Sequence, residues 1–167
     1  PQLGMTLVSG AGDVVQLDEL IAAGPAVLFY FSAGCSHCEE VAPEIGRLGQ
    51  RLNADAALIA IASGSNSLSA ARDFVARHQL PGSVYKDFSR QFSSRNRLQS
   101  TPSVLLTAPS PEPGGFETLA EYRPFAPGMS LLVEMRLASH LGEDPWSRVE
   151  QGQYYGPKAC GACHLDE

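Results

Sequence analysis

Apolar residues follow two spacings along this chain, one typical of strands and one typical of helices. The segments Ala26–Phe31 and Ala57–Ala62 are continuous apolar runs, and such runs are typical of strands that are buried on both faces. After the first run, apolar residues recur every three or four positions, which predicts a helix that begins at or just after Cys35. Pro43 lies inside this helix and is expected to kink it.

Weaker patterns supply the other elements. The first part of the chain predicts an apolar stretch at 5–8, a turn at 10–13 and a short helix at 17–21. The second part predicts a helix at 68–75 capped by Ser67, a strand at 83–85, a helical stretch across 88–98, strands at 104–106 and 117–122, and a helix at 131–141. Helices that alternate with buried strands indicate a layered α/β domain.

Size and charge narrow the function classes. The chain has 167 residues, of which 44% are hydrophobic and 18% charged, so it can bury a core and suits one domain with an appendage. A net charge of −6 without a basic cluster argues against a nucleic-acid partner. The longest strongly apolar run, Ala26–Phe31, is far shorter than the roughly 20 residues of a membrane span.

Composition changes after Gly142. We therefore place the α/β domain at 1–142 and a linker or surface-packed tail at 143–159, in which Trp146 is expected to pack on an apolar surface. Residues 160–167 form a separate short segment with its own chemistry.

The four cysteines form two C-x-x-C pairs, and context must decide the meaning of each pair. Cys35 stands where a helix begins, and the partial positive charge of a helix N-terminus lowers a thiol pKa. Cys38 lies one helical turn later, within disulfide reach. Cys35 could therefore attack a disulfide and Cys38 could resolve the mixed disulfide, while a nearby His37 imidazole would stabilise the Cys35 thiolate further.

A zinc site is the competing interpretation of this first pair, but it needs two more ligands, and His78 and His140 are isolated in the sequence.

The residues around this pair resemble the active-site segment of thioredoxin-like proteins. The match runs from Phe29 through Glu44, FYFSAGCSHCEEVAPE, and includes the proline of the following helix, Pro43. Thr101 and Pro102 resemble the cis-proline loop of the family, which faces the disulfide and pairs with the substrate chain. The resemblance covers roughly residues 3–142 and implies a thioredoxin fold, with a central mixed β-sheet flanked by helices and an irregular C-terminal tail. It implies thiol–disulfide exchange that needs no cofactor.

Departures from the family pattern leave the direction of electron flow open. The usual tryptophan before the motif is absent, since Ala33 and Gly34 stand there. Phe29 takes the position of a buried acid that assists proton transfer in typical thioredoxins. The C-x-H-C pattern resembles DsbA-like oxidants, whereas Thr101 and the compact size resemble TlpA-like reductants of the cell envelope.

The second pair carries a different pattern. Cys160, Cys163 and His164 read C-x-x-C-H, in which two thiols can add to haem vinyl groups and the histidine can ligate the iron. The segment YYGPKACGACHLDE resembles a haem-binding segment of multihaem cytochromes c. We expect haem c there in a longer protein, of which this chain is the N-terminal part, but not in this chain itself, because it ends soon after His164. Half a zinc site, a second disulfide and a disordered tail are the alternatives.

These observations predict a thiol–disulfide oxidoreductase at Cys35–Cys38, with protein thiols or disulfides, or a redox protein, as partners. An electron-transfer or docking module of an attached cytochrome, and a binding module with an inactive site, are the alternatives. Haem attachment and disulfide chemistry both predict a periplasmic or otherwise extracytoplasmic location.

Overall fold

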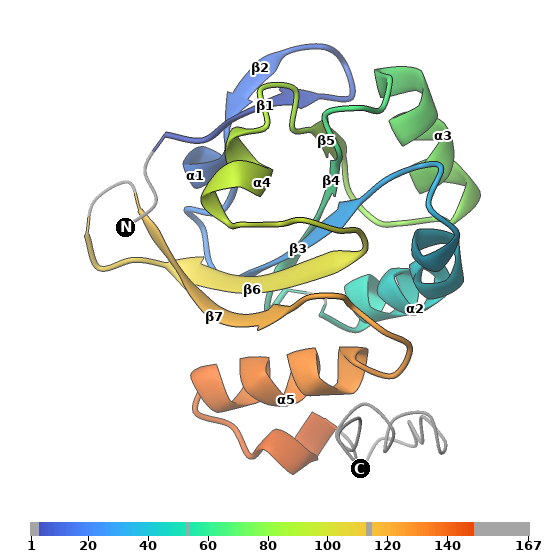
Figure 1. Ribbon diagram of the computed structural model, residues 1–167. Coiled ribbons are helices and arrows are strands. Elements are labelled where there is room, and N and C mark those ends of the chain that lie inside the picture. Colours follow the sequence, from blue (N-terminus) through green and yellow to red (C-terminus); the bar gives the residue numbers. More distant parts are fainter. Residues whose placement is uncertain (1–3, 53, 113–114, 149–167) are drawn as a thin grey trace.

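The computed structural model describes residues 4–52, 54–112 and 115–148 as one mixed β-sheet with helices on both faces (Figure 1). The sheet has seven strands in the order β2-β1-β5-β4-β3-β6-β7. The strands are β1 (Thr6–Ser9), β2 (Val14–Gln16), β3 (Ala26–Phe31), β4 (Ala57–Ala62), β5 (Val84–Lys86), β6 (Ser103–Pro109) and β7 (Phe116–Tyr122). The helices are α1 (Leu17–Leu20), α2 (Ser36–Leu52), α3 (Leu68–Arg77), α4 (Gln91–Arg95), α5 (Ser130–His140) and the 3-10 turn η1 (Pro145–Arg148).

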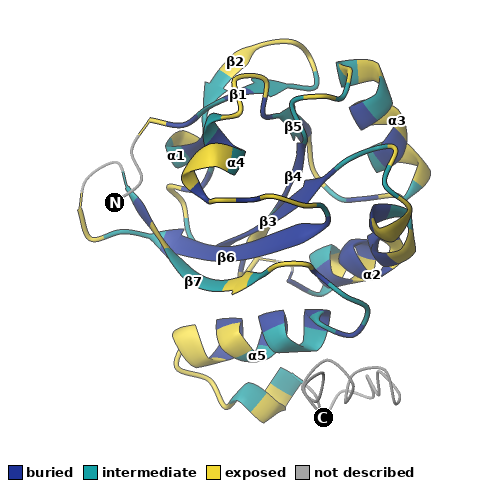
Figure 2. Ribbon diagram, in the orientation of Figure 1, coloured by how far each residue is buried: buried dark blue, intermediate teal, exposed yellow. Residues whose placement is uncertain are grey.

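Strand β3 is the centre of the sheet. Every residue of β3 is buried, as expected for an apolar run of this length with neighbours on both sides (Figure 2). It pairs in parallel with β4 and antiparallel with β6, so that Tyr30 lies opposite Ser103. The carboxyl end of β3 therefore lies beside the first residues of β6.

Two cores cover the two faces of the sheet. One core contains alternate residues of β3 together with apolar residues of α2, α3 and α5. In this core the rings of Phe31 and Phe74 stack at a centroid distance of 4.4 Å. The other core packs the remaining residues of β3 against α1, α4 and β1, with Tyr30 against Phe92.

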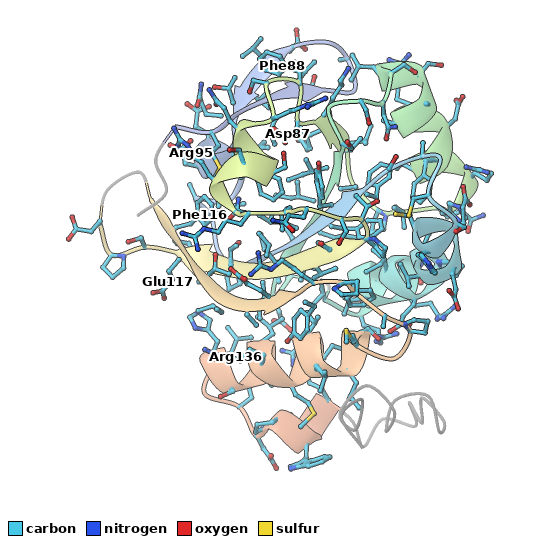
Figure 3. All side chains as sticks on the ribbon, in the orientation of Figure 1. Asp87, Phe88, Arg95, Phe116, Glu117 and Arg136 are labelled. Carbon is cyan, nitrogen blue, oxygen red and sulfur yellow. The ribbon has the colours of Figure 1, made fainter. Side chains whose placement is uncertain are left out.

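Two buried carboxylates, those of Asp87 and Glu44, hold the starts of helices α4 and α5. Asp87, at 0% exposure, accepts hydrogen bonds from the backbone N–H groups of Phe92 and Ser93, and it thereby holds the start of α4 (Figure 3). Glu44 of α2 accepts hydrogen bonds from the N–H groups of Gly128 and Ser130 at the start of α5. These contacts satisfy helix N-terminal donors that would otherwise lack partners.

Most predicted elements are confirmed. The strands at Ala26–Phe31 and Ala57–Ala62 have the predicted bounds, and Ser67 caps α3 by accepting a hydrogen bond from Ala70 N–H at 3.1 Å. Three expectations are corrected. No strand was predicted directly after the turn at 10–13, but β2 lies there, and its three residues are too few to show the two-residue period of a strand. The helical stretch across 88–98 shrinks to Gln91–Arg95, and Phe88 lies outside it with 46% of its surface exposed.

The third correction concerns Trp146, which is 60% exposed, so most of its surface faces solvent instead of an apolar surface. Its backbone N–H bonds the Asp144 carboxylate within a short turn, while Arg148 of the same turn bonds Asp55 and Glu143. Polar contacts therefore hold this turn. The remainder of the predicted tail, 149–159, and the segment 160–167 lie outside the described residues. Among the helices that the structure describes, none is both long and apolar enough to cross a bilayer.

Candidate active site

Cys35 and Cys38 lie at the start of α2, directly after the loop that leaves β3. The Cys35 N–H donates to the Ser32 carbonyl at 3.1 Å, which closes this loop, and the helix begins at Ser36. Cys38 is in the first turn of α2, and its backbone N–H donates to the Cys35 sulfur at 3.3 Å. Both cysteines are free thiols, with Cys35 partly exposed and Cys38 buried. The predicted placement of Cys35 where a helix begins, with Cys38 one turn later, is confirmed, and the structure adds that Cys38 is the covered sulfur.

The environment of Cys35 favours its thiolate. Burial alone would raise the pKa of Cys35, but hydrogen bonds from the side chains of Cys38 and Thr101 oppose this effect. Backbone hydrogen bonds from Cys38 and His37 act in the same direction, and the net result is a pKa below the ordinary value for cysteine. Cys35 is therefore the better nucleophile of the pair.

Cys38 has the opposite character. Burial and the hydrogen bond to the Cys35 side chain raise the pKa of Cys38 to about 12. Phe29 is fully buried in β3 and stacks on Phe31, so it supplies no acid to this region. Cys38 stays protonated at neutral pH, which suits a sulfur that acts second.

Thr101 and Pro102 form the wall opposite the cysteines. Their peptide bond is cis, as the resemblance implied, and they directly precede β6. The Cys35 thiol donates to the Thr101 carbonyl at 3.5 Å, and the Pro102 carbonyl accepts from Phe125 N–H at 2.9 Å. The antiparallel pairing of β3 with β6 thus brings together two motifs that are far apart in the sequence.

His37 lies at the edge of this site. Its side chain is 79% exposed, and Nδ1 is 3.8 Å from the Glu40 carboxylate. The contribution of His37 to the Cys35 thiolate comes from its backbone. Together with Val41, Pro102 and Phe125, the imidazole lines a mainly apolar hollow of about 250 Å³.

Two polar residues that the sequence analysis did not single out support the site. Asn66 accepts a hydrogen bond from Ala33 N–H at 2.9 Å, and its amide donates to the Ser32 hydroxyl at 3.3 Å. Asn66 lies in the loop that follows β4 and holds the loop before Cys35. Glu44 is the second residue, because it anchors the loop that contains Phe125 through Gly128 and Ser130. Such contacts leave no local signal in a sequence.

Glu39 follows Cys38 but does not act as an isolated charge. Its carboxylate bonds Arg77 at 2.8 Å and His78 at 2.5 Å, both at the end of α3. The start of α2 is thereby tied to α3.

In the described ranges, no three His, Cys, Asp or Glu side chains come close enough together to hold a metal ion. Cys160, Cys163 and His164 lie outside those ranges.

Comparison with known proteins rests on structure alone, since no family model and no curated protein matches the sequence. A secreted disulfide oxidoreductase of Mycobacterium tuberculosis, described as homologous to E. coli DsbE, superposes with a TM-score of 0.62 at 18% identity, covering 80% of this chain and 94% of that one. An uncharacterised thioredoxin-like protein of Porphyromonas gingivalis gives 0.65 at 16% identity, covering 92% and 95%. The chain has the thioredoxin fold.

This fold also serves other thiol chemistry. The bacterioferritin comigratory protein of Xanthomonas campestris, described with alkyl peroxide reduction activity, superposes with a TM-score of 0.66 at 13% identity, covering 81% of this chain and 90% of that one. At identities this low, the superpositions establish the thioredoxin fold alone, and the reaction depends on the residues that this chain places at the site. Here those residues are Cys35, Cys38 and the cis Thr101–Pro102 bond.

Proposed function

We propose that this chain catalyses thiol–disulfide exchange, with Cys35 as the attacking sulfur and Cys38 as the resolving sulfur. The observation that carries the proposal is the asymmetry of the pair. Cys35 is partly exposed with a lowered pKa, whereas Cys38 is buried with a pKa raised to about 12. A vestigial pair would not require one activated and one protected sulfur.

The reaction follows from this asymmetry. The Cys35 thiolate attacks one sulfur of a substrate disulfide, forms a mixed disulfide and releases the other substrate sulfur as a thiolate. Cys38 then loses its proton, attacks the Cys35 sulfur and releases the second substrate thiolate. The substrate is reduced by two electrons and the Cys35–Cys38 pair is oxidised. The same steps in reverse transfer the disulfide to a substrate.

Two serine variants test this assignment. Cys38→Ser should accumulate a mixed disulfide with a protein or glutathione disulfide, because the second sulfur is missing. Cys35→Ser is the matched control and should form no such adduct at neutral pH, because the remaining thiol is buried and protonated. Mass spectrometry after acid quenching distinguishes the two. Equal adduct formation by both variants would remove the assigned roles.

The direction of exchange is set by the reduction potential of the pair. Titration against glutathione gives this potential directly. A value near roughly −120 mV would identify a disulfide donor, and one near roughly −270 mV a reductant.

A second proposal concerns the C-terminal segment. We propose that Cys160, Cys163 and His164 bind haem c in a longer form of the protein, so that the thioredoxin-fold domain serves as an electron-transfer or docking module of a cytochrome. Support comes from the donor set, since two thiols separated by two residues can bond the haem vinyl groups and the adjacent imidazole can ligate the iron. Haem would supply one-electron redox chemistry.

Expression of the longer protein in cells that carry out c-type haem maturation tests this second proposal. Covalent haem should stain the protein on a denaturing gel, and Cys160→Ala with Cys163→Ala should abolish the stain. Both proposals fit an extracytoplasmic location, where disulfides persist.

A further inference from the structure

A polar hollow of about 270 Å³ adjoins Thr101 and is separate from the apolar one. It is lined by Leu98 and by six polar residues, Tyr30, Ser32, Ser63, Gln99, Ser100 and Thr101. They come from the carboxyl ends of β3 and β4 and from the segment before β6. Open α/β sheets commonly bind ligands at this edge, outside the carboxyl ends of parallel strands.

The hollow lies next to the reacting sulfur. Thr101 contributes to both hollows, and its carbonyl accepts the hydrogen bond from the Cys35 thiol. A substrate whose cysteine reaches Cys35 therefore places neighbouring groups near both hollows. One is lined by Val41, Pro102 and Phe125, and the other by hydroxyl and amide groups.

The walls of the polar hollow are held in place. Ser32 bonds Asn66, and the Ser103 hydroxyl donates to the Ser100 carbonyl at 2.9 Å. The Arg123 guanidinium donates to the carbonyls of Asn96 and Arg97, directly before the segment that forms one wall. A preformed wall reduces the entropy that a ligand must lose on binding.

Tyr30 is the side chain best placed to select a ligand. Its ring packs on Phe92 within the core, and Tyr30, at 7% exposure, is one of the residues that line the hollow. A polar ligand in the hollow would meet the hydroxyl, which is the polar end of this side chain. Within the part of the chain that the structure describes, no side chain donates to or accepts from this hydroxyl. It is available for a ligand.

We propose that this hollow is a substrate subsite for an uncharged polar side chain, such as Asn, Gln, Ser or Thr, next to the cysteine that Cys35 attacks. This inference rests on the proposed thiol–disulfide exchange. No charged side chain is among the described residues lining the hollow, so a buried charge would lack a counter-ion there. An apolar side chain in the hollow would leave the Tyr30 hydroxyl without a partner.

Short peptides that carry one cysteine, each in a mixed disulfide with glutathione, test the subsite. The residue before the cysteine, and separately the residue after it, is Asn, Leu or Asp. On one of the two sides, we expect the Asn peptide to exceed both others in kcat/KM by about three- to tenfold, the usual contribution of one neutral hydrogen bond. Tyr30→Phe should reduce that preference to nearly one.

Tyr85→Phe is the matched control. This variant loses the same hydroxyl from β5, which is separated from β3 by β4 in the sheet, and Tyr85 lines a different hollow beside Gly10 and Arg72. This variant should retain the full preference. Equal kcat/KM for all three peptides, or a preference that survives Tyr30→Phe, would overturn the subsite while exchange itself stands.

Binding of the same peptides with serine in place of cysteine, measured by calorimetry, separates the two proposals. A preference for Asn in binding that Tyr30→Phe removes, without any exchange of the cysteine peptides, would retain the subsite and refute the redox assignment. Equal binding of all three serine peptides, together with unselective exchange, would overturn the subsite.

Discussion

Removal of the Glu44 carboxylate should destabilise the domain more than removal of any exposed acid on the same helix. Glu44 is 9% exposed, and both of its oxygens accept from Gly128 N–H, at 2.9 and 3.1 Å, while one also accepts from Ser130 N–H at 3.0 Å. Glu44→Ala leaves two N–H groups at the start of α5 without their acceptor. Hydrogen bonds to a charged group contribute about 1.5–3 kcal/mol each.

We therefore expect Glu44→Ala to lower the free energy of unfolding by about 3 kcal/mol, measured by urea denaturation. At about 2–4 °C per kcal/mol for a domain of this size, the midpoint of thermal unfolding should fall by about 6–12 °C. Glu44→Gln keeps one acceptor oxygen and should lose about half as much. Glu40→Ala, whose side chain is 55% exposed, is the control and should change stability by less than about 0.5 kcal/mol.

The Glu44 variants also test how this loop contributes to substrate binding. Glu44 anchors the loop that contains Phe125, which lines the apolar hollow beside Pro102. Below the unfolding temperature, Glu44→Gln should raise KM for a peptide disulfide more than it changes kcat. If the free energies of unfolding of Glu44→Ala and Glu40→Ala differed by less than about 0.5 kcal/mol, the view that these hydrogen bonds hold the loop at the start of α5 would be refuted.

Three further outcomes are expected. Resolution of the mixed disulfide should accelerate about tenfold per pH unit from pH 7 to 10, because burial raises the pKa of Cys38 to about 12 and only its thiolate attacks; a flat stopped-flow profile would contradict this. Arg51→Ala should lower the free energy of unfolding in urea by about 3–5 kcal/mol, because it breaks the ion pair that Arg51 makes with the buried Glu134 carboxylate at 2.9 Å. The double change Arg51→Met with Glu134→Leu should cost much less, and equal losses would show that breaking the pair is not the cause. Ser67→Ala should cost about 1 kcal/mol through loss of the α3 cap, and an unchanged unfolding midpoint would show that the cap contributes nothing.

The sequence was most informative where local chemistry decides structure. The continuous apolar runs of β3 and β4 favour strands inside a sheet, where apolar side chains are covered on both faces, so the bounds of these strands could be predicted to the residue. The position of Cys35 at a helix start also followed from local spacing. Thr101 and Pro102 were identified through resemblance, since nothing in the local pattern says that they face Cys35.

Long-range polar contacts could not be predicted. Asn66 and Glu44 hold the site through partners 33 and 84 or more positions away in the chain. His37 illustrates the same limit, because its place in the motif suggested an imidazole beside the thiolate, whereas its side chain points to solvent and faces Glu40. Which face of a helix turn a side chain takes depends on packing that the motif does not encode.

The antiparallel ladder between β3 and β6 has a consequence for how this protein can vary. Tyr30 and Ser103 are paired, so the distance from Cys35 to Pro102 is set by strand register rather than by the length of the intervening chain. Insertions around 110–115 would leave that distance intact. A single-residue deletion inside β6 would shift one motif past the other by about 3.3 Å and turn its side chains to the opposite face. The connection between β6 and β7 can therefore lengthen in evolution, but the two halves of the reaction centre must stay in step.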